Sequence, residues 1–194
     1  VTALGNIGTG LVVALFMLFF VLHGGGGIWR WSVGLLPPAS AIGVAALGVA
    51  TGLTWGTGYS AAREMIVGVD APLWFGPAKF VATLATAVAG LPGGIFAPSL
   101  AVGAGVGNLL REVFPASPTS AVVILGMVGY FAGVVRAPLT AVIILSETTA
   151  SRGLMLPMFA TAFIADAASQ WVCREKLYHG LSRGFAMAPE PRPQ

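Results

Sequence analysis

Long stretches without a charged residue dominate the chain. Four such runs cover residues 1–22, 32–62, 80–110 and 113–135. A helix that crosses a lipid bilayer needs about 20 mostly apolar residues, so each run is long enough for one crossing. The pattern predicts helices that are surrounded largely by an apolar medium.

Glycine and proline interrupt these apolar runs. The chain has 27 Gly and 13 Pro, and many of them stand inside the runs, as in LPGG at residues 91–94. Both residue types break helices, and broken helices inside a membrane are tolerated where protein or a polar cavity surrounds them. The pattern is typical of a channel or transporter rather than a simple anchor. We expect an all-α fold with helices over residues 4–22, 37–55, 77–89, 95–111, 121–135, 138–149, 151–171 and 176–183.

The helix expected over residues 95–111 is unusually short for a spanning segment. It would be roughly 24 Å long at 1.5 Å per residue, against about 30 Å for the hydrocarbon core. We therefore expect it to begin near the middle of the membrane. Ser99, Gly103 and Gly107 recur every four residues along it, which predicts a small-residue face for close helix packing.

Composition agrees with a lipid environment. Hydrophobic residues make up 56% of the 194 residues, only 9% are charged, and the mean hydropathy is +0.86. A soluble domain has about 25% charged residues. Four of the charges, on Arg63, Glu64, Asp70 and Lys79, fall in residues 63–79, and we expect this segment at a water-facing end.

Several function classes find no support in the residues. The net charge of +3 is small and dispersed, which argues against a nucleic-acid surface. Cys173 is the single cysteine, so the chain forms no disulfide within itself. His23 and His179 are isolated and lack metal-ligand spacing. We identify no catalytic residues, no metal site and no cofactor, and we expect the chain not to be an enzyme.

Residues 91–100 carry the strongest functional signal. Gly93 and Gly94 let the backbone approach a ligand closely. A helix that starts at Ile95 leaves its first N–H groups unpaired, and its dipole adds about half a positive charge at that end. Such an end binds an anion without a full cation. The alternative is a helix break that serves only packing.

Four stretches resemble the CLC family of chloride channels and chloride/proton exchangers. GGIFAP at 93–98, which ends at Pro98, is similar to the GxFxP signature, and RAPLT at 136–140 followed by ET at 147–148 is similar to a second family stretch. GTGY at 56–59 resembles a glycine-rich turn of that family, and KLY at 176–178 resembles the start of its last helix. The order and spacing of all four fit the second half of the family's membrane domain over residues 37–185.

The resemblance implies a fold and a site. It implies a polytopic transmembrane protein with tilted and broken helices, in which this chain forms one of two inverted halves. Backbone N–H groups of Ile95 and Phe96, together with the Tyr178 hydroxyl, would hold the central chloride, which is the substrate. Gly93, Gly94 and Pro98 would support the motif. Two further anion-site turns of the family, one of which bears its gating glutamate, do not occur here.

Two acidic residues receive structural interpretations. Glu147 lies near a helix C-terminus, where a carboxylate is unfavourable, and we expect Thr148, Thr149 or N–H groups of the next helix to brace it. Asp166 departs from the family pattern and stands inside an apolar helix. Gln170 and Arg174 follow it at i+4 and i+8, which favours a polar contact along that helix.

These observations predict a membrane transport protein for chloride, either a channel or a chloride/proton antiporter. The transmembrane domain would cover residues 1–187, and residues 188–194 would form a disordered tail. We expect the chain to work with a missing N-terminal half of the same polypeptide and as a homodimer, with its C-terminus in the cytoplasm and the protein in the plasma (inner) membrane. The alternatives are another anion-substrate secondary transporter and a non-conducting membrane fragment.

Overall fold

The computed structural model describes residues 36–88 and 94–172, and these residues are entirely helical apart from turns and loops. The predicted helices over 4–22 and 176–183 lie outside the described residues. The described elements are α3 (Leu36–Thr51), α4 (Tyr59–Val67), α5 (Phe75–Val88), α6 (Phe96–Arg111), α7 (Thr119–Val135), α8 (Pro138–Thr149), the 3₁₀ turn η1 (Arg152–Leu154) and α9 (Met155–Val172).

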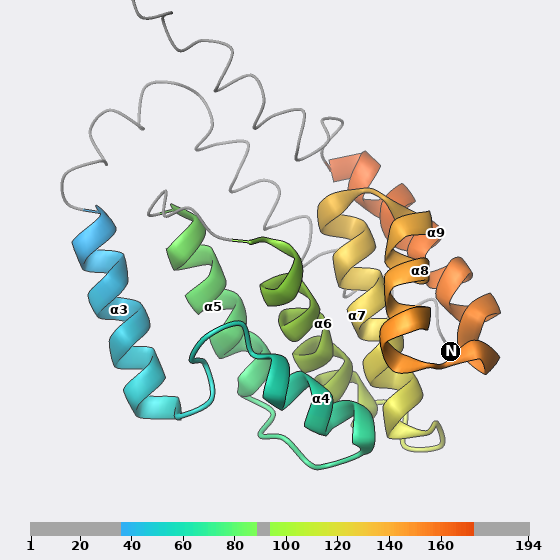
Figure 1. Cartoon of the computed structure of the whole chain (residues 1–194), viewed down its shortest axis with the longest axis horizontal. Helices are drawn as coiled ribbons and strands as arrows, with labels where there is room; N and C mark the ends of the chain where they lie inside the picture. The colour runs from blue at the N-terminus through green and yellow to red at the C-terminus, as the bar shows by residue number, and fades with distance from the viewer. Residues whose placement is uncertain (1–35, 89–93, 173–194) are drawn as a thin grey trace, which may run out of the picture.

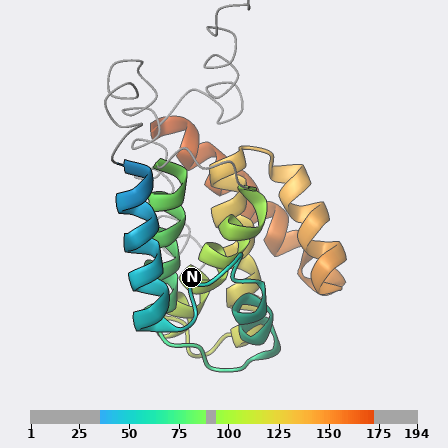
Figure 2. The same ribbon diagram turned by 60° about the vertical axis from the view of Figure 1, so that its left-hand side comes forward.

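The helices form a row, with α6 and α7 at its centre (Figure 1). On one side α5 packs against α6, and α3 packs against α5. On the other side α7 packs against α9 and α8, so that α3 and α8 lie at opposite edges (Figure 2). Helix α4 crosses over α6 and α7 near the end of the bundle where α6 finishes.

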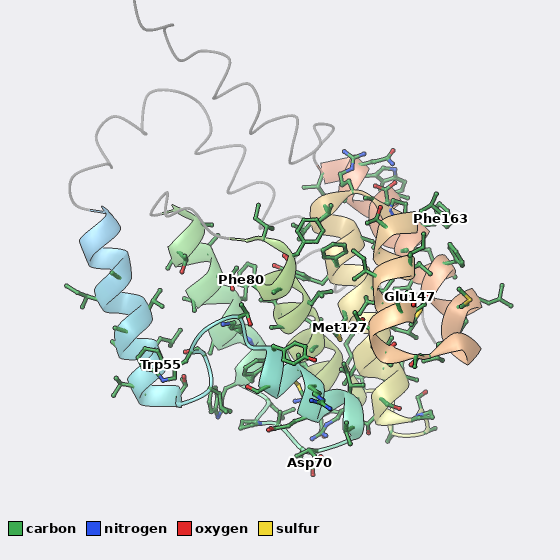
Figure 3. All side chains as sticks on the ribbon, viewed as in Figure 1. Trp55, Asp70, Phe80, Met127, Glu147 and Phe163 are labelled. Carbon is green, nitrogen blue, oxygen red and sulfur yellow. The ribbon has the colours of Figure 1, made fainter. Side chains whose placement is uncertain are left out.

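Helix α7 is the core of the bundle. From Val123 onward nearly every residue of α7 is buried, on all sides of the helix. A helix that is hydrophobic all round is a buried helix, and α7 has neighbours on every side in α4, α6, α8 and α9. Met127 lies in the middle of this packing (Figure 3).

The predicted small-residue face of α6 is confirmed. A Cβ atom built on Gly103 would lie 2.7 Å from the Cα of Met127, and one on Gly107 would lie 2.6 Å from the Cα of Val123. Gly126 of α7 belongs to the same contact between the two helices, because a Cβ atom built on it would lie 2.7 Å from the Gly103 carbonyl oxygen. The backbones of α6 and α7 therefore touch directly, which fixes their spacing and register.

The helix bounds agree with the sequence to within two residues for α6, α7 and α8, whereas α9 begins at Met155, after the turn η1, instead of at residue 151. Helix α6 begins one residue later than predicted and ends where predicted, and α8 has the predicted bounds. The prediction was right to within two residues for α5 but wrong for residues 52–67, because α3 ends at Thr51 instead of residue 55 and α4 was not predicted at all. Glycines in the left-handed conformation, Gly58 and Gly68, stand at the two ends of α4. The sequence was interpreted there as a glycine-rich break followed by a charged, water-facing segment.

No helix within the described ranges combines the length and the hydropathy that an unbroken membrane crossing needs.

Candidate anion-binding site

The N-terminus of α6 begins directly after the PGG segment. Ile95 is the N-cap residue, with φ −83° and ψ −28°, and no side chain caps this end. The first backbone bond runs from the N–H of Ser99 to the carbonyl of Ile95 at 3.1 Å, and the Ser99 hydroxyl donates to the same carbonyl at 2.7 Å. The N–H groups that come before Ser99 in this turn therefore have no carbonyl partner within the helix.

This helix end carries positive potential, and within the described residues no acidic side chain of its first turn neutralises it. The first turn of α6 contains no acidic residue. Pro98 has no N–H, so the donors at this end are the amides of Ile95, Phe96 and Ala97. Gly94 and Ala97 are exposed, and no described atom lies within 4 Å of where a Gly94 Cβ would stand. As far as residues 36–88 and 94–172 show, the end is therefore open to a small anion.

Helix α7 holds this end in place. The rings of Phe96 and Phe131 are 5.1 Å apart between centroids and tilted by 50°. Phe131 is fully buried, whereas Phe96 remains 41% exposed. Aromatic pairs in this range attract each other, so the first residue of α6 is tied to the core while its backbone stays accessible.

The predicted site residues divide into two groups. Gly94, Ile95, Phe96 and Pro98 lie together at the N-terminus of α6. Gly93 and Tyr178 lie outside the described residues. The contribution of the Tyr178 hydroxyl thus stays a prediction from the sequence.

The glycine-rich GTGY turn packs against the same helix. Gly56 and Gly58 have φ values of +59° and +78°, which glycine adopts at little cost. A Cβ on Gly58 would lie 2.8 Å from the Cβ of Ala101 in α6. The GTGY stretch therefore contacts the helix that the GGIFAP stretch begins, about one turn after Pro98.

Lys79 is a functional candidate that the sequence reasoning missed. We expected it at a water-facing end, but it is only 3% exposed. Its Nζ donates to the carbonyls of Thr54 at 2.9 Å and Gly56 at 2.6 Å. An ionisable group buried in this way marks a site of structural or functional constraint. The signal was present, since Lys79 is the one charged residue between Asp70 and Arg111.

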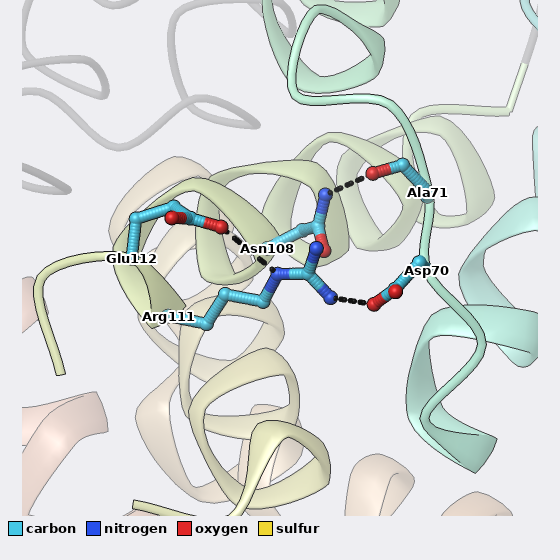
Figure 4. Close-up of polar contacts among 5 residues, drawn as sticks. All are labelled: Asp70, Ala71, Asn108, Arg111 and Glu112. Carbon is cyan, nitrogen blue, oxygen red and sulfur yellow. Dashed lines mark hydrogen bonds and ion pairs between the residues drawn. The ribbon is translucent and has the colours of Figure 1, made fainter. Parts of the chain in front are cut away.

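The C-terminus of α6 is anchored by polar side chains (Figure 4). Asn108, which is 1% exposed, donates from Nδ2 to the carbonyl of Ala71 at 2.9 Å. Arg111 forms an ion pair with Asp70 and a longer one, at 3.7 Å, with Glu112. These contacts tie the loop before α5 to the end of α6.

The two acidic residues that the sequence singled out have different surroundings. Asp166 accepts from Gln170 Nε2 at 2.8 Å, which confirms the contact at i+4, and Arg174 lies outside the described residues. Asp166 also pairs with Arg136 of the RAPLT stretch at 3.3 Å, a partner that was not predicted.

Among the residues that the structure describes, Glu147 makes none of the contacts that we expected for it. It is exposed on α8 (Figure 3), and the hydroxyls of Thr148 and Thr149 donate to carbonyls of their own helix instead. The proposed bracing of Glu147 by these threonines was therefore wrong, because in an apolar helix each hydroxyl is satisfied one turn back.

An uncapped helix N-terminus, preceded by glycines and held in an apolar helical bundle, is an arrangement by which transport proteins bind anionic groups. The comparison with known families agrees with this class. Residues 2–170 match the family described as voltage gated chloride channel. The chain therefore belongs to the voltage-gated chloride channel family.

Individual relatives point the same way. The chain is 36% identical over 122 residues to the H(+)/Cl(-) exchange transporter ClcA of Yersinia pestis bv. Antiqua (strain Angola), covering 59% of this chain and 26% of the relative. The transporter of the same name from Yersinia pseudotuberculosis serotype O:3 (strain YPIII) matches with the same identity and coverage. The chain thus spans about a quarter of the length of these relatives.

Proposed function

We propose that this chain supplies one half of an anion pathway, chiefly for chloride, in a membrane-embedded transport subunit. Membership of the voltage-gated chloride channel family supports this function, as does the similarity to transporters named for H(+)/Cl(-) exchange. The subunit acts as a channel or as a chloride/proton antiporter and catalyses no chemical reaction.

The observation that carries the proposal is the open N-terminus of α6. Amides of Ile95 and Phe96 offer partial positive charge, and no acidic or basic side chain stands in the first turn to repel or trap the ion. A permeation site must bind well enough for the ion to enter and weakly enough for it to leave. Partial charges meet that requirement better than a buried Lys or Arg would. The Tyr178 hydroxyl adds one neutral donor, and Gly93 and Gly94 keep side chains away from the ion.

The surroundings of the site are consistent with an incomplete pore in a bilayer. Large apolar side chains are exposed along the outer faces of α8 and α9, among them Ile143 at 58%, Leu156 at 84% and Trp171 at 94%. Phe163 on the same side projects away from the bundle (Figure 3). We propose that a second subunit covers this face in a homodimer, and that a missing N-terminal half of the polypeptide and lipid cover other apolar surface.

The proposed orientation places the C-terminus in the cytoplasm of a cell whose inner membrane holds the protein. Basic residues cluster after α9 at Arg174, Lys176, Arg183 and Arg192, and cytoplasmic segments carry such an excess. A tag at the C-terminus should resist protease added outside intact cells, and its cleavage there would contradict the orientation.

Anion flux in liposomes tests the function. The complete subunit should carry chloride and not small organic carboxylates, and movement of protons against the chloride gradient would identify an antiporter. The 194-residue chain by itself should not conduct, because the faces meant for the other half remain unsatisfied. Carboxylate flux without chloride flux would favour another secondary transporter, and no flux of either anion would indicate a non-conducting membrane protein.

The role of Tyr178 has its own test. Tyr178→Phe in the complete subunit should weaken chloride binding by roughly 0.5–3 kcal/mol, which spans the values for one hydrogen bond with a neutral or a charged partner. Tyr59→Phe is the matched control, since Tyr59 is 70% exposed at the start of α4. Calorimetric chloride binding that is equal in both variants and in the wild type would remove Tyr178 from the site.

A further inference from the structure

Two side chains of α9 bind the last turn of α7. The Ser169 hydroxyl donates to the carbonyl of Gly133 at 2.9 Å, and the Asp166 carboxylate pairs with Nε of Arg136 at 3.3 Å. Gln170 holds the second carboxylate oxygen of Asp166 at 2.8 Å. Because the three α9 residues stand at i, i+3 and i+4, they lie on one face of that helix.

Arg136 ends α7 in an unusual conformation. Its φ of 57° lies in the left-handed region, which is unfavourable for a residue with a Cβ atom and is commonly taken by glycine at helix ends. The Arg136 side chain is 6% exposed and the Asp166 side chain 18% exposed, so this ion pair is largely shielded from solvent. The cation also suits the negative end of the α7 dipole. Asp166 thus helps to hold a turn that would otherwise be strained.

The end of α7 lies beside the candidate anion site. Helices α6 and α7 run antiparallel, so the C-terminus of α7 and the N-terminus of α6 lie at the same end of the bundle (Figure 1). Phe131 precedes Arg136 by five residues, a rise of about 7.5 Å along the helix. Its ring packs on Phe96, the first residue of α6. A shift of the α7 end would therefore move the partner that holds Phe96.

We propose that Asp166 and Ser169 are positioning residues for the anion site. By fixing the last turn of α7 they keep Phe131 against Phe96, and so keep the amides of the α6 N-terminus in the geometry that binds the ion. This inference rests on the function proposed above. It assigns a role to Asp166, the residue at which this chain departs from the family pattern.

Chloride titration calorimetry on the complete subunit tests the proposal. Asp166→Asn keeps the size of the side chain and removes its charge, and Ser169→Ala removes only the hydroxyl. Each should weaken chloride binding by about 3–10-fold, the effect of losing one hydrogen bond of ordinary strength. Glu64→Gln, which removes a carboxylate from the exposed side of α4, should leave the affinity within about twofold.

A double-mutant cycle separates positioning from a general loss of stability. Phe131→Leu should weaken chloride binding in the wild type but have a clearly smaller effect in the Asp166→Asn background, because the contact that it disturbs is already displaced. If the fold-losses in chloride affinity from Phe131→Leu and Asp166→Asn simply multiply in the double variant, the two residues are not coupled and the proposal is overturned. So would wild-type affinity in both Asp166→Asn and Ser169→Ala. A wild-type subunit that binds no chloride would instead refute the proposed function itself.

Discussion

The two ends of α6 are built in opposite ways. At the C-terminus, Asn108 and Arg111 bind the loop before α5, through the Ala71 carbonyl and the Asp70 carboxylate. At the N-terminus no side chain caps the helix, and the adjacent position of Gly94 is open. Every helix leaves unpaired groups at both ends, so the difference shows which end this sequence closes and which it leaves available.

Local sequence explains the contrast. Ser, Thr, Asp and Asn are the usual N-cap residues, but Ile95 occupies that position and glycines precede it. The chain thus omits the side-chain acceptor that would satisfy the α6 amides. Anchoring at one end and close packing along the length give the open end a fixed position, which a binding site requires.

The largest effect is expected where the glycines of α6 and α7 touch, between the two ends of α6. Gly103→Ala places a methyl group 2.7 Å from the Cα of Met127, and overpacking of this kind costs about 1–3 kcal/mol or more. The melting temperature of the complete subunit should fall. Gly43→Ala on α3 is the matched control, because nothing lies within 4 Å of that position. An equal melting temperature for both variants would contradict the close approach of α6 and α7.

A carboxylate added at either end of α6 should show most clearly that only the N-terminal end affects chloride binding. Ala97→Asp places an acid in the first turn of α6, where it satisfies the free amides and repels an anion. We expect chloride affinity to drop by about tenfold or more while the fold gains roughly 0.3–1 kcal/mol from the helix dipole. Ala116→Asp puts the same charge in the exposed loop beyond the other end and should leave binding unchanged. An equal loss of chloride affinity in both variants would mean that the added negative charge, and not its place at the α6 N-terminus, weakens binding.

Removing the buried anchor should affect stability and spare binding. Asn108→Leu loses the bond to the Ala71 carbonyl and leaves that acceptor unpaired, at a cost of about 1–2 kcal/mol. Denaturation should show the loss, whereas chloride affinity should stay within about twofold of the wild type because the open end is untouched. A large drop in affinity from this variant would mean that the C-terminal end takes part in the site.

The smallest effect is expected at the exposed ion pair. The Asp70 side chain is 85% exposed, and exposed pairs contribute about 0–1 kcal/mol. Asp70→Asn should therefore lower stability slightly at low salt and hardly at all at high salt, where the charges are screened. A salt-independent loss well above this range would show that Asp70 has a further role.

Much of α6 could be predicted from the sequence because its signals are local. The glycine interruption places the start of the helix, and the i, i+4, i+8 spacing of Ser99, Gly103 and Gly107 gives the face that packs on α7. The RAPLT stretch likewise gives the start of α8, since proline at the first position of a helix fixes where it begins.

Contacts between distant residues could not be predicted. The partners of Lys79 are backbone carbonyls 25 and 23 residues earlier in the chain. Every residue has such a carbonyl, so the sequence does not distinguish these two from the others. The partner of Asp166 stands 30 residues before it, while Gln170, on the same face of the helix, was predicted correctly. Helix α4 was missed because it has only nine residues and glycines flank it at both ends, a pattern that is also typical of a loop.

Anomalous diffraction from a bromide derivative of the complete subunit tests the central claim most directly. Bromide replaces chloride and can be located independently of the protein. The open end of α6 predicts a bromide ion within about 4 Å of the amide nitrogens of Ile95 and Phe96, slightly longer than an ordinary N–H hydrogen bond because of the size of the ion. Ala97→Asp should abolish that peak. Bromide bound elsewhere in the subunit, with the N-terminus of α6 empty at saturating bromide, would contradict the account.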